Sequence, residues 1–406
     1  MEKTKTKVDL VNGSNKINVD LKKYGMFLVL IALFLLFFFF TKGANFTPAN
    51  INNLILQNGY VVIMAVGMLL CVLTGNVDLG VGSVVAFTGA TVGTILMDMK
   101  TALPNETVRI VIAIVAAIAI GLACGGFAGF FISVLKVPPF IVTLATMLMG
   151  RGATYVMLQA KTKGPLPNAF NYIGAGYLPT INATIMGQKL DLLCIIVAII
   201  ATVFIIFLEM RDLQTKRKYH FSENPMWQII LKDGIIIAIV WFIMYKLACY
   251  HGIPFVLVIM GLIVAIYNFI TSSTVSGRQI YAVGGNRKAA SLSGIDTDKV
   301  FFWVYTNMGF LAAIAGIVLA ARMGSATPKA GDGYEMDAIA SCYIGGAAVA
   351  GGSGTIMGAV VGAFIMGVLN NGMILFGLST DIQKIVKGAV LLIAVTADLL
   401  SKRKKG

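Results

Sequence analysis

Apolar segments of about 20 residues recur along the chain, and they limit its possible folds more than any other feature. They show no strict apolar-polar alternation, so they fit membrane-spanning helices and not the strands of a β-barrel. Of the 406 residues, 58% are hydrophobic and 12% are charged, which lies outside the range of a soluble domain. We therefore predict an all-α polytopic membrane protein.

About twelve spans are predicted, and ten if two weak ones are re-entrant. The weak segments are 140–159 and 337–350, which are short or interrupted by glycine. The full set of predicted spans is 24–41, 54–74, 82–98, 108–135, 140–159, 190–209, 233–249, 254–270, 300–322, 337–350, 355–376 and 382–399.

The distribution of basic residues predicts the orientation. The net charge is +14, with basic residues before the first span and in the tail 401–406. Positive charge favours the cytoplasmic side, so both termini are predicted there, and nucleic-acid binding is not indicated. The loop 161–189 falls outside on this topology although it carries three lysines, which conflicts with the rule. The expected organisation is a cytoplasmic segment 1–23, one transmembrane domain 24–400 and a basic cytoplasmic tail 401–406.

An internal repeat is weakly visible in the sequence. Asp78 opens one segment and Asp337 opens another, each with small residues about ten positions later, and the next segments share glycine spacing. Homology between the halves is the preferred interpretation. Gly-rich apolar helices also resemble one another by composition alone.

Ionisable residues are nearly absent from the predicted spans. Asp78, Glu335 and Asp337 lie where helices are expected to begin, and a carboxylate there caps free N–H groups, which is the preferred interpretation of all three. Buried carboxylates would mark proton or cation coupling. Because they are nearly absent, a secondary transporter driven by an ion gradient is a weaker hypothesis than a transporter with another energy source. The chain lacks a phosphate-binding loop that ends in Gly-Lys-Ser/Thr, and it shows no metal-ligand spacing.

Uncharged polar residues inside spans are candidates for contact with a hydroxyl-rich solute, although such residues more often join helix to helix. These substrate-path candidates are Asn58, Thr88, Thr143, Asn307, Asn370 and Asn371.

A short polar helix is predicted within residues 281–295, between apolar segments. Asn286 is a good N-cap, and Gly294 followed by Ile295 fits a Schellman stop. A helix of about two turns is marginal alone, so it needs a partner surface. That surface is either another protein or the rest of this chain.

Residues 288–294, KAASLSG, resemble the Glu-Ala-Ala-x-x-x-Gly coupling motif of ABC importer permeases, with Lys288 at the usual Glu position. The segments 64–83, 137–147, 333–363 and 364–395 match the same family. Over most of residues 50–400, the chain therefore resembles the permease subunits of ABC importers for ribose, xylose and multiple monosaccharides.

The resemblance implies a type II-like ABC importer permease of the bacterial cell membrane, a pore subunit without catalysis. It implies a second copy as dimer partner, a cytoplasmic ATPase that holds ATP and Mg, and an extracytoplasmic sugar-binding protein. This chain itself would bind no cofactor and no metal. Two spans near 190–249 are extra relative to the ribose type, which favours xylose or related sugars. Branched-chain amino acids, nucleosides and a signalling sugar remain alternative substrates.

The resemblance also assigns residues to roles within a cytoplasmic coupling loop, 271–299, and beyond it. The expected ATPase-coupling residues are Gly284, Gly285, Asn286, Lys288, Ala289, Ala290 and Gly294. The structural or gating candidates are Asp78, Gly82, Pro138, Glu335, Asp337, Gly345 and Gly346.

Overall fold

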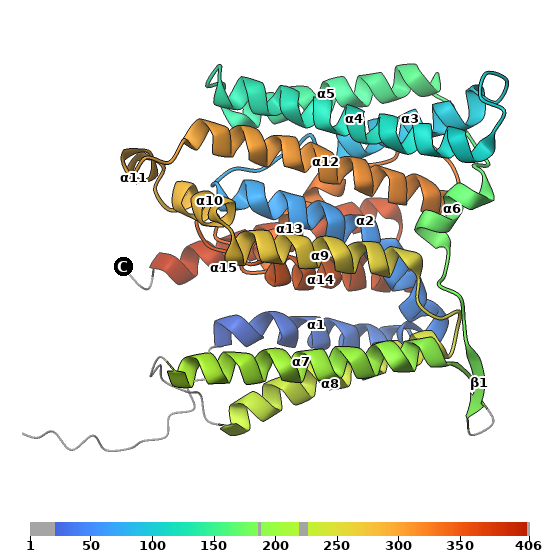
Figure 1. Cartoon of the computed structure of the whole chain (residues 1–406), viewed down its shortest axis with the longest axis vertical. Coiled ribbons are helices and arrows are strands. Elements are labelled where there is room, and N and C mark those ends of the chain that lie inside the picture. The colour runs from blue at the N-terminus through green and yellow to red at the C-terminus, as the bar shows by residue number, and fades with distance from the viewer. Residues whose placement is uncertain (1–20, 186–187, 219–225, 404–406) are drawn as a thin grey trace, which may run out of the picture.

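The computed structural model describes residues 21–185, 188–218 and 226–403. These residues form a bundle of helices with one small β-hairpin (Figure 1). The helices of the first half are α1 (Leu21–Phe40), α2 (Pro48–Leu73), α3 (Val81–Asp98), α4 (Glu106–Ser133), α5 (Pro139–Leu158) and α6 (Asn168–Ala175), with a 3-10 turn at Ala44–Phe46. The later helices are α7 (Leu192–Lys218), α8 (Met226–Ala248), α9 (Phe255–Ser273), α10 (Val275–Gly285), α11 (Arg287–Leu292), α12 (Thr297–Met323), α13 (Tyr334–Ile344), α14 (Ile356–Leu375) and α15 (Thr380–Arg403).

The predicted spans agree with these helices to within a few residues at most boundaries. Eight helices in the described part of the chain are long and apolar enough to cross a membrane. Segment 140–159 forms the full 20-residue helix α5 and is one of them. Segment 337–350 does not span: α13 has only 11 residues, about 16 Å, because its sequence ends in consecutive glycines.

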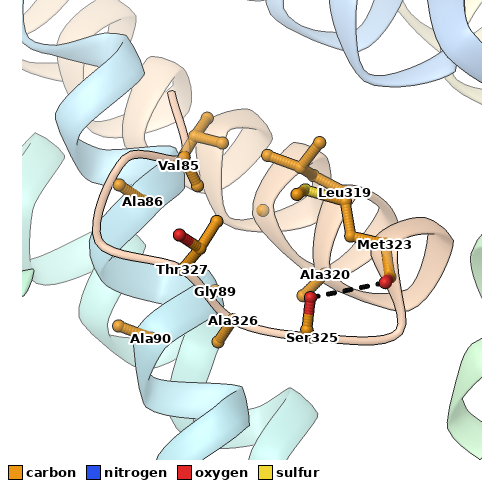
Figure 2. Close-up of a pocket in the computed structure, with 12 residues that line it drawn as sticks. Val85, Ala86, Gly89, Ala90, Leu319, Ala320, Met323, Ser325, Ala326 and Thr327 are labelled. Carbon is orange, nitrogen blue, oxygen red and sulfur yellow. Dashed lines mark hydrogen bonds between the residues drawn. The ribbon is translucent and has the colours of Figure 1, made fainter. Parts of the chain in front are cut away.

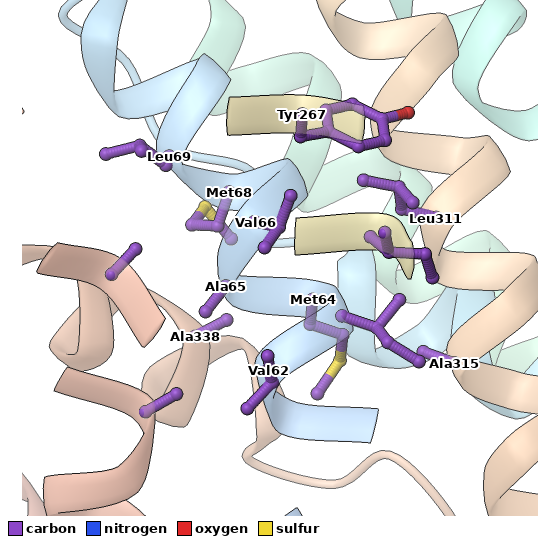
Figure 3. Close-up of a cluster of buried hydrophobic side chains, with 14 of the residues drawn as sticks. Val62, Met64, Ala65, Val66, Met68, Leu69, Tyr267, Leu311, Ala315 and Ala338 are labelled. Carbon is purple, nitrogen blue, oxygen red and sulfur yellow. The ribbon is translucent and has the colours of Figure 1, made fainter. Parts of the chain in front are cut away.

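Helix α2 is the centre of the core. Most of its residues are buried, and side chains from α9, α12 and α13 pack around it (Figure 3). Tyr267 of α9, Leu311 of α12 and Ala338 of α13 are among its neighbours in this cluster. A helix that is apolar all round belongs in the interior, which is the position α2 takes.

The two predicted repeats exchange their packing partners. In each half, a long helix (α2 or α12) is followed by a loop, a shorter helix (α3 or α13) and another long helix (α4 or α14). Helix α12 packs mainly on α4, α2 and α3, whereas α13 and α14 pack on α2. This reciprocal arrangement is what an internal repeat predicts.

The loop 161–189, where the charge rule conflicted with the predicted topology, is ordered by tertiary contacts. It contains α6 and leads into a hairpin of β1 (Asn182–Ile185) and β2 (Gln188–Asp191). The chain returns after α8 at nearly the point from which it left. The amide of Leu178 donates to the carbonyl of Ile253 at 2.9 Å, and the amide of Phe255 donates to the carbonyl of Gly176 at 2.9 Å.

The helices α7 and α8 lie where the sequence predicts an extra pair of spans, 190–249, and α7 is one of the eight helices that are long and apolar enough to cross a membrane. Helix α7 packs mainly against α8, and most of its apolar side chains are exposed. In Figure 1 the pair lies beside α1 at one edge of the bundle.

One end of the bundle carries α10, α11, the described C-terminal end and the start of α1 (Figure 1). Residues 1–20 and 404–406, which hold most of the predicted terminal segments, lie outside the described residues.

Candidate coupling surface and solute path

Helix α11 has the predicted caps at both ends. The side chain of Asn286 accepts a hydrogen bond from the amide of Ala289 at 2.9 Å. At the other end, the amide of Ile295 donates to the carbonyl of Ala290 and that of Gly294 to Ser291, which is the Schellman pattern. Gly294 takes φ +83, a conformation that favours glycine. The sequence therefore defines this helix locally.

One expected coupling residue of α11 is buried in the chain itself. Lys288 and Ala289 are exposed, but Ala290 is 5% exposed because it packs into the chain's own core. Leu292 is 82% exposed, although it is a large apolar residue on a polar helix. The sequence analysis missed Leu292. The sequence signal that could have identified this residue is that Leu292 is the one large apolar side chain among the small and polar residues 286–294.

Ionic contacts hold α11 against the start of α12. The guanidinium of Arg287 lies 4.5 Å from the ring centroid of Phe301 and 3.4 Å from the Asp298 carboxylate. Asp298 also pairs with Lys136, which precedes α5. The Asp296 carboxyl accepts the Lys299 amide at 3.1 Å, and this hydrogen bond lowers its pKa below the usual range. Asp298 therefore connects three segments at this end.

Helix α10 directly precedes α11 and packs against it. The sequence analysis did not separate these two helices. Two of the expected coupling residues, Gly284 and Gly285, belong to α10 and precede α11, which we call the docking helix. A Cβ on Gly284 would lie 1.6 Å from the carbonyl oxygen of Leu73, the last residue of α2. Gly284 thus permits a backbone-to-backbone contact with α2, whereas a Cβ on Gly285 would meet nothing within 4 Å.

Four of the six substrate-path candidates have hydrogen-bonded side chains in this conformation, and two of these, Asn58 and Asn371, join helices. Asn58 donates from its side-chain amide to Ala363 at 2.8 Å, which joins α2 to α14. Asn371 exchanges two side-chain hydrogen bonds with Asn50, at 2.9 and 3.0 Å. Thr88 and Thr143 bond to carbonyls of their own helices.

The other two candidates retain unsatisfied polar atoms. Asn307 accepts a hydrogen bond from the Tyr267 hydroxyl, but its buried Nδ2 has no partner among the described residues. The buried Oδ1 of Asn370 likewise has none there. Asn307 and Asn370 are thus the polar candidates with unused hydrogen-bonding capacity.

The gating candidates lie at helix ends, as their sequence positions predict. Pro138 precedes α5, and the Asp78 carboxylate accepts the amide of Gly80 at 2.7 Å before α3. Asp78 is only 8% exposed, so this carboxylate is buried at the start of α3. A Cβ on Gly82 would lie 2.4 Å from the Glu335 carboxylate, so the starts of α3 and α13 meet.

The remaining gating candidates belong to α13 and its end. Gly345 caps this helix, and Gly346 follows with φ +84. Asp337 lies in the first turn of α13, but its carboxylate pairs with Lys387 of α15 at 2.9 Å. No capping hydrogen bond from Asp337 is found among the described residues, so the ion pair with Lys387 takes the place of the expected cap.

Two basic residues correct the expectation that spans are nearly free of charge. Lys387 lies about two turns into α15 and is half-buried. Arg151 lies within α5, where its guanidinium donates to the carbonyls of Pro328 and Ala330 at 3.2 and 2.6 Å. Both residues lie inside predicted spans, 140–159 and 382–399, and only their partners, which are far away in the sequence, could not be predicted.

A small cavity lies between α3, the end of α12 and the following loop (Figure 2). Gly89, Ala320, Met323 and Thr327 are among its lining residues. Its volume of about 10 Å³ is room for about one water molecule. This cavity is therefore too small for a sugar.

The sequence was compared with known proteins and structures. A family model described as "Branched-chain amino acid transport system / permease component" matches residues 50–395. A xylose transport system permease protein of Haemophilus influenzae is 34% identical over 387 residues, covering 95% of this chain and 98% of the relative. The xylose transport system permease protein of Escherichia coli K12 is 33% identical over the same length, covering 95% and 94%. The ribose import permease protein of Escherichia coli K12 is 35% identical over 353 residues, covering 87% and 86%. No solved structure matches.

Proposed function

Because the chain belongs to the family of branched-chain amino acid transport system permease components, we propose that it is the membrane subunit of an ATP-driven importer for a monosaccharide. Xylose is the first candidate, and ribose is the second. Relatives named as xylose and ribose permeases support this choice, since the alignments cover most of both chains.

The observation that carries the proposal is the exposed, capped helix α11. It presents Leu292 outside the core, on a segment held in place by Asp298 and Arg287. An exposed leucine on a preformed helix suits a hydrophobic cleft in a partner, because little ordering entropy is lost on binding. The partner we propose is a cytoplasmic ATPase, which would supply the ATP and Mg chemistry.

The rest of the assembly follows from the same proposal. Two copies of this non-catalytic chain form the pore, and an extracytoplasmic binding protein delivers the sugar. Both termini are cytoplasmic, in line with the C-terminal end lying at the same end of the bundle as α11 (Figure 1). The coupling loop and the α7–α8 pair are parts of one permease domain.

The family description favours a second candidate substrate, a branched-chain amino acid. Reconstitution of this chain with its ATPase and binding protein in liposomes separates the candidates. We expect xylose to accumulate inside and to raise ATP hydrolysis about tenfold, which is ~1.4 kcal/mol of activation free energy. A response to leucine alone would make the chain an amino acid permease. Uptake that survives ATP depletion and stops with an ionophore would contradict an ATP-driven mechanism.

A further inference from the structure

The segment between α13 and α14, residues 345–355, receives direct contacts from α10, and we call it the glycine loop. The hydroxyl of Tyr281 donates to the carbonyl of Gly354 at 2.7 Å. The amide of Gly352 donates to the carbonyl of Leu73 at 2.9 Å, at the point where Gly284 also meets α2. Backbone contacts this close leave no compressible side chains between the elements, so a displacement of α10 must displace the glycine loop.

The glycine loop is in turn bonded to the end of α13. The amide of Ala347 donates to Cys342 at 3.0 Å, and that of Ala348 donates to Ser353 at 2.8 Å, so the loop folds back on itself. Helix α13 and the first part of the loop therefore move as one body.

Helix α13 and its flanking residues hold α15 by three polar contacts along its length. Lys384 pairs with Asp332 at 3.0 Å, and Lys387 pairs with Asp337 at 2.9 Å. Nearer the other end, the amide of Val349 donates to the Asp398 carboxylate at 3.3 Å. Helix α15 also packs on α13 more than on any other element of the described chain.

The two ion pairs, Lys387–Asp337 and Lys384–Asp332, differ in burial. The side chains of Lys384 and Asp332 are each 64% exposed, whereas that of Asp337 is 3% exposed and that of Lys387 22%. A buried ion pair contributes little net stability compared with well-packed apolar side chains. Ionisable residues within membrane segments usually have a functional role.

The hydrogen bonding around this buried pair is incomplete in the present conformation. The second carboxylate oxygen of Asp337 is buried and accepts no hydrogen bond within the described residues, and the same holds for Oδ1 of Asn370 on α14. The Asn370 side chain interacts with the Asp337 carboxylate, and its own Oδ1 stays unsatisfied beside the ion pair. Unsatisfied buried acceptors are costly, which favours a second arrangement that provides donors.

We propose that Asp337 and Lys387 are positioning residues for transport: their ion pair holds α13 against α15 in one state of the pore and breaks when α10 moves the glycine loop. The proposal rests on the proposed function, because the motion of α10 originates in the ATPase. In this scheme the motion is transmitted from α11 through α10 and the glycine loop to α13.

The test uses the complete complex of permease, ATPase and binding protein in liposomes. It compares Lys387→Met, which removes the buried charge, with Lys384→Met, which removes the exposed charge one turn earlier. We expect Lys387→Met to lower sugar-stimulated ATP hydrolysis and uptake about tenfold, with basal hydrolysis and co-purification of the ATPase unchanged. Lys384→Met is expected to stay within about twofold of the native complex, because exposed pairs are weak.

A double variant, Asp337→Asn with Lys387→Met, distinguishes positioning from a structural role. If the pair only avoids an unpaired buried charge, neutralising both residues restores stimulated hydrolysis, and this result would overturn the proposal. If the pair is a conformational contact, the double variant stays uncoupled. The double variant also carries the test if Lys387→Met fails to fold. A native complex without sugar stimulation contradicts the proposed function, whereas a native response retained by Lys387→Met contradicts the ion-pair proposal alone.

Discussion

At the scale of single residues, the docking helix shows how far a local motif can be interpreted. The caps of α11 depend on residues within ten positions of one another, and the hydrogen bonds of Asn286 and Ile295 confirm them. Which face of α11 is exposed depends on the core, where Ala290 packs and from which Leu292 points away. The tertiary fold therefore decides which residue of the motif is available to a partner.

Leu292→Asp is predicted to weaken binding of the ATPase. The side chain is 82% exposed, so its replacement leaves the core of this chain intact. An exposed leucine that fills a partner's cleft contributes as an interface hot spot, so we expect a loss of about thirtyfold in affinity, ~2 kcal/mol. Titration of the ATPase onto the permease in nanodiscs measures this loss of affinity.

Val275→Asp is the matched control for this substitution. Val275 is also an exposed apolar residue, 59% exposed, but it lies at the start of α10. A carboxylate is tolerated at a helix N-terminus, and we expect native affinity. Equal losses in both variants would show that added negative charge, and not the leucine contact, causes the effect.

At the scale of elements, the sequence predicts helices well where apolar runs end at glycine, proline or charge. The helices α3, α5 and α14 begin and end within about two residues of their predicted limits. Helix α10 was missed because VSGRQIYAVGG lacks both apolar length and periodicity. The contact of Asp337 with Lys387 was missed because the two residues lie 50 positions apart on different helices. Such pairings are set by tertiary packing, and no single segment encodes them.

Gly284→Ala is predicted to separate α10 from the end of α2. Its new Cβ would lie 1.6 Å from a backbone carbonyl, so the helix must move and the contact at Gly352 is lost. Since we propose that this contact transmits motion, sugar-stimulated hydrolysis should fall about tenfold while basal hydrolysis remains. ATPase assays of the reconstituted complex measure both rates.

A glycine outside the coupling loop provides a control for the added methyl group. A Cβ on the exposed Gly261 of α9 meets nothing within 4 Å, so Gly261→Ala should behave as the native chain. Native coupling in Gly284→Ala would argue that α10 does not act through α2 and the glycine loop.

At the scale of the whole molecule, the packing of the two halves explains which parts are essential. Each long central helix is surrounded by helices of the other half, so removing an element of either repeat would expose the core. The pair α7–α8 lies outside this exchange and contacts mainly its own members. Its sequence looked like an insertion, and its position at the edge of the bundle agrees with that interpretation (Figure 1).

Deletion of residues 180–251, bridged by a linker of about four residues, is predicted to leave a working permease. The ends are already adjacent, since Leu178 and Ile253 are hydrogen-bonded at 2.9 Å. The variant loses the packing of Leu247 and Cys194 on the core, so a lower melting temperature is expected. Sugar-stimulated hydrolysis should stay within about threefold of native, below the ~1.4 kcal/mol of a tenfold loss. A shortened chain that inserts and binds the ATPase yet no longer responds to sugar would show that the α7–α8 pair takes part in transport.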